Sequence, residues 1–192
     1  TLALTLGLLR NKLDARMNAE EGACIRAVRK VYAQQAGIPL DQTPEPKTIC
    51  AIGLGQAEGN VAAAREAFRR MGEVAGDAVA QALTLIDALV VVGGGVSGAA
   101  PLFLPALVDA MNDVFVREGD PMPRLIPRTF NFEDPAQRAA FLKSSAKELT
   151  VPGSTRKVFY DPVPRTAVGL SRLGTSESVA IGAYAYALNR LG

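Results

Sequence analysis

A short apolar run, residues 88–92, leads directly into a turn that carries three consecutive glycines. The residues of this glycine turn are Gly93, Gly94, Gly95, Val96 and Ser97. Because glycine has no Cβ, a flat ligand can lie against the bare backbone of the turn, and amide N–H groups at the start of the following helix can point at it. The pattern predicts a non-covalent binding site, although it would equally suit a tight strand-to-helix turn that binds no ligand.

Groups that could carry acid–base or covalent chemistry are scarce in this chain. It contains no histidine, which is the commonest general base and metal ligand in enzymes. Its two cysteines, Cys24 and Cys50, are too few for a disulfide scaffold or a four-ligand zinc site. Both fall in apolar helical patterns that predict buried free thiols. We therefore predict no catalytic residue and no metal ligand within the chain.

The elements around the glycine turn must place it where a ligand can reach it. A continuous apolar run such as 88–92 is typical of a parallel strand buried on both faces, and in α/β proteins ligands bind past the carboxyl ends of such strands. The longest predicted helix, 60–86, precedes this strand. Its Gly72 and Gly76 predict the close approach of another element, because each glycine costs about 1 kcal/mol relative to alanine. A helix over 101–117 is predicted to follow the turn, and the fold class is α/β.

The amino-terminal part of the chain is predicted to be mainly helical. Alternating apolar residues predict a strand over 1–9. Asn18 is the expected N-cap of a helix that continues to Ala36 and ends at Gly37. A short helix over 46–54 follows a proline-rich loop.

The carboxyl-terminal part is less regular. Prolines interrupt the stretch 121–153, which we interpret as an insertion or peripheral flap with a polar helix over 135–149, a domain boundary being the alternative. Two strands, 156–163 and 165–173, are expected after it. The last helix, 177–190, is rich in small residues, which would let it lie tightly against a sheet or a ligand.

Composition and charge exclude several classes of function. The 192 residues carry a net charge of +2 and are 48% hydrophobic, so a sizeable core can form and there is no basic footprint for nucleic acid. No apolar stretch reaches the roughly 18 residues of a membrane span and no signal peptide is recognisable, so we expect no membrane partner and a cytoplasmic location. The apolar faces of the long helices predict a homo-oligomer. Because the first residue is Thr1, we expect a fragment of a longer protein or a chain that lacks its start.

Three segments together carry a resemblance to a known family. They are the run 88–97, the segment 173–185 and the segment 20–28. With these segments the chain resembles the carboxyl-terminal lobe of the ROK family, which comprises sugar kinases and sugar-responsive repressors of the actin/hexokinase/Hsp70 superfamily. The order and spacing of the first two segments match that family. The resemblance extends from about residue 10 to the end of the chain and fits 121–153 least.

The resemblance implies a fold and a set of ligands. The chain would be a single lobe, 1–192, of the actin-like ATPase (ribonuclease H-like) α/β fold, with a central sheet flanked by long helices and a peripheral insertion at about 121–153. The glycine turn, Gly93–Ser97, would be the family's adenosine motif, and residues 174–182 of the final helix would close the same pocket. Glu20 aligns with a family glutamate to which no sugar contact is assigned. In the full-length parent, ATP, Mg²⁺ and a hexose would be the ligands.

The family's other functional motifs are missing from this chain. It has neither of the two phosphate loops, nor the Asn-Asp pair that deprotonates the sugar hydroxyl. The Glu-x-Gly-His sugar-binding element and the cysteine-rich zinc loop are missing as well. The resemblance therefore implies the ATP-binding lobe of a glucokinase-like enzyme, and we expect this chain to be inactive alone.

Two alternatives stay open. The same lobe could be the ligand-responsive, dimerising module of a sugar-sensing transcriptional repressor, which a helix-turn-helix in an upstream segment would reveal. An unrelated α/β binding domain could share the glycine turn alone, although it would not explain the segment 173–185. A Rossmann dehydrogenase is disfavoured, because its Gly-x-Gly-x-x-Gly fingerprint follows the first strand, whereas these glycines are contiguous and lie in mid-chain.

Overall fold

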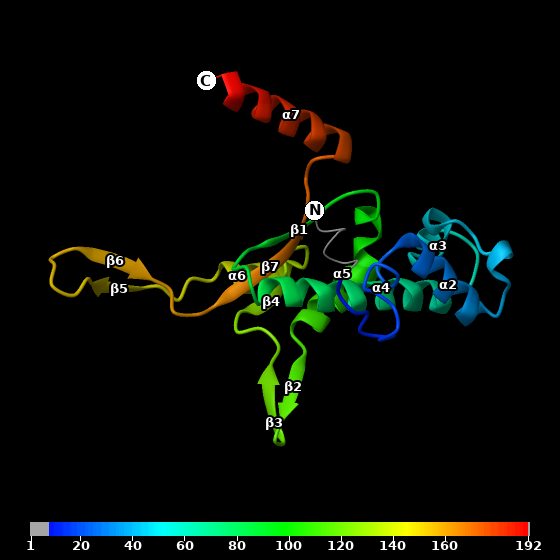
Figure 1. The fold of residues 1–192 in the computed structure, drawn as a ribbon, viewed down its shortest axis with the longest axis horizontal. Helices are drawn as coiled ribbons and strands as arrows, with labels where there is room; N and C mark the ends of the chain where they lie inside the picture. Colours follow the sequence, from blue (N-terminus) through cyan, green and yellow to red (C-terminus); the bar gives the residue numbers. More distant parts are fainter. Residues whose placement is uncertain (1–7, 192) are drawn as a thin grey trace.

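The computed structural model describes residues 8–191, and its centre is a parallel β-sheet packed against helices (Figure 1). The sheet has three strands in the order β1-β7-β4, formed by Val90–Val92, Arg165–Leu170 and Arg128–Asn131. The central strand, β7, pairs in parallel with both neighbours, with Val168 opposite Val90 of β1 and opposite Asn131 of β4. The predicted α/β class with a central sheet is confirmed.

Two long helices form the core beside the sheet. They are α4 (Val61–Leu83) and α5 (Ala100–Met111), and α5 packs against both α4 and β4. The side chain of Asn60 accepts a hydrogen bond from the backbone N–H of Ala63 at 3.0 Å and so caps the start of α4. Leu104 of α5 is fully buried in the core that the two helices share.

Glycines in α4 allow this close packing. A Cβ on Gly72 would collide with the backbone of Phe103, and a Cβ on Gly76 with the backbone of Leu107. Both obstacles are main-chain atoms of α5, which cannot rotate away as the end of a side chain could. The close approach predicted from these two glycines is confirmed.

Within residues 8–191, three further helical elements precede α4. They are α2 (Ile25–Ala36), η1 (Leu40–Gln42) and α3 (Pro46–Gly53). α2 and α3 pack against α4, and α2 ends at Gly37, whose φ of 68° is the left-handed conformation expected there. The predicted start of α2 is wrong. Asn18 accepts the backbone N–H of Glu21 at 3.0 Å and closes a separate turn, so the helix begins only after Cys24.

β1 is shorter and more exposed than predicted. Among the described strands it occupies one edge of the sheet and pairs with β7 alone. Val90 and Val92 pack against the core, whereas Val91 points away from it and is 69% exposed. The prediction of a strand buried on both faces is therefore wrong, because only one face of this strand packs against the core.

Two β-hairpins project from the body in the region around the predicted insertion (Figure 1). The elements here are β2 (Val114–Arg117), β3 (Asp120–Pro123), α6 (Pro135–Leu142), β5 (Lys147–Thr150) and β6 (Lys157–Tyr160). The predicted helix 101–117 ends at Met111, because Asn112 exchanges two hydrogen bonds, of 2.8 and 2.9 Å, with the backbone of Thr129 at β4. The predicted polar helix 135–149 stops early, and its last turn is replaced by β5. The two predicted strands after it correspond to β6 and β7, although only β7 joins the parallel sheet.

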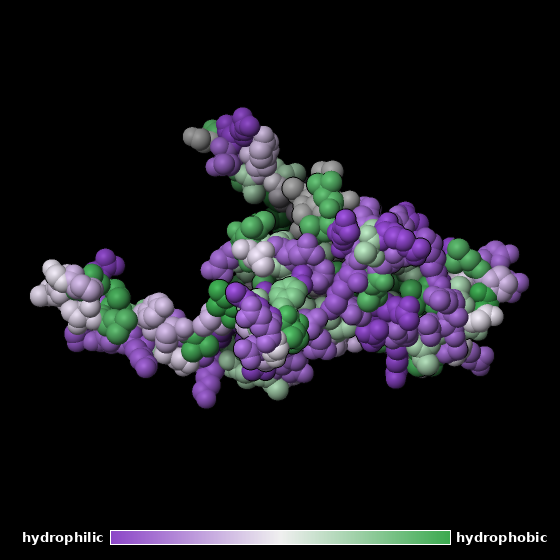
Figure 2. Space-filling view, turned by 60° about the horizontal axis from the view of Figure 1, so that its bottom comes forward, coloured by the Kyte–Doolittle hydropathy of each residue, from purple (hydrophilic) through white to green (hydrophobic). Residues whose placement is uncertain are grey.

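The last helix does not pack as predicted. α7 (Thr175–Leu191) stands clear of the body in Figures 1 and 2. A Cβ on Gly182 would meet no atom within 4 Å, so the small residues of this helix face open space. The expectations that the helix lies tightly against a sheet, and that residues 174–182 close the pocket beside the glycine turn, are therefore wrong for this structure.

The amino-terminal strand predicted over 1–9 lies almost wholly outside the described residues. The described segment that follows it forms an isolated antiparallel bridge between Arg10 and Asn18. Within residues 8–191, no helix is both long and apolar enough to cross a membrane.

Candidate nucleotide site

The glycine turn lies at the carboxyl edge of the parallel sheet. All three strands run in the same direction, so the chain segments that leave them emerge at one edge. The backbone N–H of Ser171, just after β7, donates to the carbonyl oxygen of Val92 at 2.8 Å. A Cβ on Gly93 would lie 3.4 Å from the Cβ of Ser171, so the turn and the segment after β7 touch.

Hydrogen bonds within the turn fix its shape and leave its backbone bare. Gly94 has a φ of 96°, which side-chain-bearing residues rarely adopt. Its carbonyl oxygen accepts both the backbone N–H of Ser97, at 3.1 Å, and the Ser97 hydroxyl, at 2.7 Å. A Cβ on Gly94, Gly95 or Gly98 would meet no atom within 4 Å. A ligand can therefore approach the main chain here, and Ser97 holds the turn closed.

A cavity of about 610 Å³ opens beside the turn, between it and the helices α2 and α3. Its lining residues are Ile25, Val28, Pro46, Lys47, Cys50, Ala51, Leu54, Gln56, Phe68, Gly95, Val96, Gly98 and Ala99. Most of these are apolar, and the size falls within the range of about 300–1,000 Å³ typical of small-molecule sites. The chain thus brings Gly95 and Val96 of the predicted turn to the mouth of an apolar cavity.

The charge around this cavity suits an anionic ligand. The short helix η2 (Ser97–Ala99) and then α5 begin at the turn, so the positive end of the α5 dipole lies on this side of the cavity. The N–H groups of Ser97, Ala99 and Ala100 already donate to carbonyl oxygens of the turn. Lys47 adds a full positive charge on the opposite wall, and no carboxylate is among the lining residues. Apolar walls beside a positive charge suit a ligand that combines a flat aromatic ring with a negatively charged group.

Cys50 lies on the α3 wall of the cavity. Both cysteines are free, as predicted, but both are only half-buried, so the prediction of full burial is wrong. Partial burial raises the pKa of the Cys50 thiol, which keeps it in its neutral form at neutral pH. This thiol therefore acts as part of the apolar wall and offers a chemical reporter of cavity occupancy.

The far wall of this site was not predicted from the sequence. Lys47, Cys50 and Gln56 come from α3 and the loop after it, and Ile25 comes from the first turn of α2. No local pattern links these positions to the glycine turn, because their meeting depends on how α2 and α3 pack on α4. Glu20 lies in the turn ahead of α2 and does not line the cavity.

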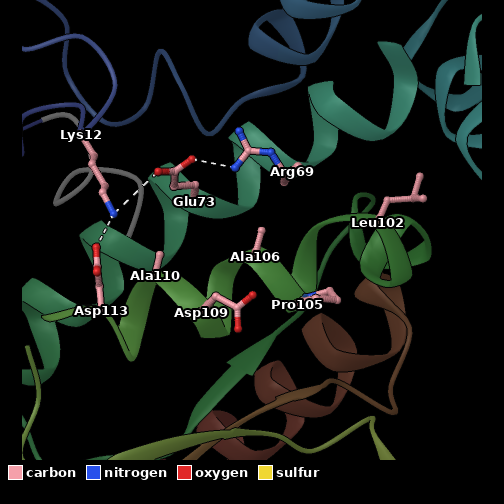
Figure 3. A pocket seen from close by; sticks show the side chains of 9 residues that line it. All are labelled: Lys12, Arg69, Glu73, Leu102, Pro105, Ala106, Asp109, Ala110 and Asp113. Carbon is pink, nitrogen blue, oxygen red and sulfur yellow. Dashed lines mark hydrogen bonds and ion pairs between the residues drawn. The ribbon is translucent and has the colours of Figure 1, made fainter. Parts of the chain in front are cut away.

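A second hollow, of about 470 Å³, lies between α4 and α5 (Figure 3). Lys12 reaches into it and pairs with Asp113 at 2.7 Å and with Glu73 at 3.7 Å, while Arg69 pairs with Glu73 at 3.0 Å. The Lys12 ammonium lowers the pKa of the Asp113 carboxyl. Because these charges neutralise one another and join the amino-terminal segment to two helices, we interpret the hollow as structural.

The described residues offer no metal centre. Within residues 8–191, no group of three or more histidine, cysteine, aspartate or glutamate side chains is arranged so that it could hold a metal ion. Whatever this lobe binds, the contacts available in the described cavity are apolar side chains, main-chain groups, Lys47, Cys50 and Gln56.

Comparison with known proteins places this fold among sugar kinases. No protein-family model matches the chain, and no curated protein sequence matches it significantly. Among solved structures, a glucokinase from Parabacteroides distasonis superposes with a TM-score of 0.82 and 42% sequence identity, over 94% of this chain and 48% of that one. A candidate sugar kinase from Cytophaga hutchinsonii has a TM-score of 0.46 and 21% identity, over 55% of this chain and 36% of that one. The chain thus has the fold of part of a glucokinase and spans about half of that protein's length.

Proposed function

We propose that this chain is the nucleotide-binding lobe of a ROK-type sugar kinase, whose complete form transfers the γ-phosphoryl group of ATP to a hexose hydroxyl. One observation carries the proposal. A bare glycine turn at the carboxyl edge of a parallel sheet opens onto an apolar cavity, in a chain that is 42% identical to a glucokinase. The binding role of Gly93, Gly94, Gly95, Val96 and Ser97 is part of this proposal.

The cavity suits the base and ribose of a nucleotide. An adenine ring would lie in the cavity between Val96 on one side and the α2–α3 wall on the other, with Gly95 allowing close contact to the main chain. The phosphates would then extend toward the start of α5, where the positive end of the helix dipole favours anions. Mg²⁺ would be held by the phosphates and by groups that do not line this cavity, because its described lining contains no carboxylate.

The chemical step needs more than the described lining of this cavity offers. Phosphoryl transfer depends on positioning, on charge stabilisation and on a group that accepts the hydroxyl proton. None of the side chains that line the cavity is a carboxylate or a histidine. We therefore expect the isolated chain to bind ATP without phosphorylating glucose, and a coupled assay for ADP release would test this directly.

A substitution in the turn tests the binding site. A leucine at Gly95 would project into the open space of the cavity without steric conflict, and Gly95 has no left-handed φ that would strain the variant. We expect Gly95→Leu to weaken binding of a non-hydrolysable ATP analogue at least about tenfold while thermal stability stays unchanged. Gly182→Leu is the matched control, because its side chain also meets open space but lies on α7, away from the cavity.

Chemical protection gives an independent readout. In a Cys24→Ser background, bound ATP should slow the reaction of Cys50 with a maleimide, since the thiol lies on the cavity wall. Equal labelling rates with and without saturating ATP, or unchanged affinity in Gly95→Leu, would show that nucleotides bind elsewhere. The sugar-sensing repressor stays a prediction, and ATP-dependent sugar phosphorylation by a longer form of this protein would exclude it.

A further inference from the structure

Among the described residues that line the nucleotide cavity, Gln56 alone carries a side-chain amide. Apolar walls hold a flat ring, whereas polar groups in a pocket fix its orientation and provide specificity. An amide can donate and accept hydrogen bonds at the same time, while the ammonium of Lys47 only donates and the thiol of Cys50 does both weakly. Gln56 is therefore the group in this lining that can recognise a donor and an acceptor on one ligand.

The end of α3 holds the backbone of Gln56 in a fixed place on the cavity wall. Gly55 has a φ of 74°, and its N–H donates to the carbonyl oxygen of Ile52 at 2.9 Å. The N–H of Gln56 donates to the carbonyl oxygen of Ala51 at 2.8 Å. These two bonds form a Schellman motif, in which the position of Gln56 commonly carries an apolar residue that packs against the last turn of the helix. The helix end itself therefore gives no reason for an amide at this position.

The amide group of Gln56 is available to a ligand. The residue is exposed where it lines the cavity, and among the described residues its amide has no hydrogen-bond partner. It lies just beyond the carboxyl end of α3, where the helix dipole favours an N–H donor on the ligand. Lys47 lies in the first turn of α3, so its positive charge is at the other end of the same wall. An N–H group of a ligand thus fits best at the Gln56 end.

We propose that Gln56 selects the base of the bound nucleotide by accepting a hydrogen bond from the 6-amino group of adenine. On adenine this amino group lies beside a ring nitrogen that accepts a hydrogen bond. The amide oxygen of Gln56 accepts from the amino group while its N–H donates to the ring nitrogen, the bidentate pairing that glutamine makes with adenine in nucleic-acid recognition. The inference rests on the proposed function and deepens it, because it names the residue that makes the site prefer 6-aminopurine nucleotides.

The test removes the amide and the amino group separately and then together. Affinities for ATP and for purine riboside 5′-triphosphate, which lacks only the 6-amino group, are measured by isothermal titration calorimetry in the wild type and in Gln56→Leu. We expect the wild type to bind ATP about tenfold more tightly than the analogue, because the analogue leaves the amide oxygen without a partner. Gln56→Leu should weaken ATP binding by at least this factor and bind both nucleotides equally. A purely structural role of Gln56 would change both affinities alike and leave their ratio unaltered.

Two further variants complete the comparison. Gln56→Glu keeps acceptor oxygens and loses the N–H donor, so it should bind both triphosphates more weakly and still prefer ATP. Gln35→Leu is the matched control, because Gln35 is an exposed glutamine of α2 that does not line the cavity, and it should leave both affinities unchanged. The melting temperature of Gln56→Leu should not fall, since an apolar residue suits this position of a Schellman motif.

The outcomes separate this inference from the proposed function. Equal affinities of the wild type for the two nucleotides, an unchanged ratio in Gln56→Leu, or a lost preference in Gln56→Glu would each overturn the role of Gln56. If ATP still slows the maleimide labelling of Cys50 in these cases, nucleotide binding in the cavity stands without base recognition by Gln56. If no nucleotide binds and Cys50 is not protected, the proposed function fails and this inference fails with it.

Discussion

Replacing Gly76 by alanine should destabilise this lobe, although alanine is the better helix former. In α4, the new Cβ would collide with the main chain of Leu107 in α5, with the Leu107 Cα and carbonyl carbon both at 2.9 Å. A helix backbone cannot move out of the way locally, so α5 must shift as a whole against α4 and the sheet. The perturbation therefore tests whether these two helices are in the close contact that the structure shows.

Two opposing effects set the size of the change. Helix propensity alone would make Gly76→Ala more stable by about 1 kcal/mol. Overpacking a well-packed core costs about 1–3 kcal/mol and occasionally more, and a main-chain obstacle places this site at or above the upper end. We expect a net loss of about 2 kcal/mol in the free energy of unfolding. For a chain of this size, that corresponds to a melting temperature lower by about 4–8 °C.

The measurement is urea and thermal unfolding followed by circular dichroism, with Gly182→Ala as the control. A Cβ on Gly182 meets no atom within 4 Å, so this variant should melt no lower than the wild type. Gly72→Ala should resemble Gly76→Ala, and the double variant should lose less than the sum, because the first substitution already displaces α5. A Gly76→Ala variant as stable as the control would refute the close α4–α5 packing.

Three further changes test other parts of the structure. Arg124→Met removes the partner that lies 2.9 Å from the buried carboxylate of Asp77, so urea unfolding should show a loss of about 3 kcal/mol; no loss would mean that Asp77 does not need this partner. Hydrogen bonding to Arg69 lowers the pKa of Glu66 from 4.5 to about 2, so this pair stabilises the fold above pH 4.5 and loses its effect as the pH falls toward 2. Glu66→Gln should therefore flatten the stability profile across that interval, and an unchanged profile would contradict the assignment. Because burial raises the pKa of Cys50, maleimide labelling of the folded chain should be slower than that of the urea-unfolded chain at pH 7.5, and equal rates would contradict it.

Features that depend on neighbours in the sequence could be predicted well. The glycine pair in α4 signalled a close helix contact, and Asn60 and Gly37 marked a helix start and a helix end. In each case the cause is local, since a missing Cβ, a capping side chain or a left-handed φ belongs to one residue. The run into the glycine turn also located a strand of the parallel sheet, although its apolar composition predicted burial on both faces and the strand lies exposed at an edge.

Features that depend on distant parts of the chain could not be predicted in this way. The residues Val114–Arg117 continue the apolar spacing of α5, yet they form β2, because Asn112 ties the end of the helix to Thr129. The cavity wall formed by Lys47 and Cys50 exists only because α2 and α3 pack on α4. The position of this wall could therefore not be predicted from the sequence, because only the tertiary structure brings α3 opposite the glycine turn.

The lining of the cavity bears on both parts of the proposed function. Among the described residues its side chains are apolar apart from Lys47, Cys50 and Gln56, so they could hold the ring of a nucleotide but could not remove a proton from a sugar hydroxyl. The proposed function therefore assigns nucleotide binding to this cavity and leaves proton transfer to groups that do not line it.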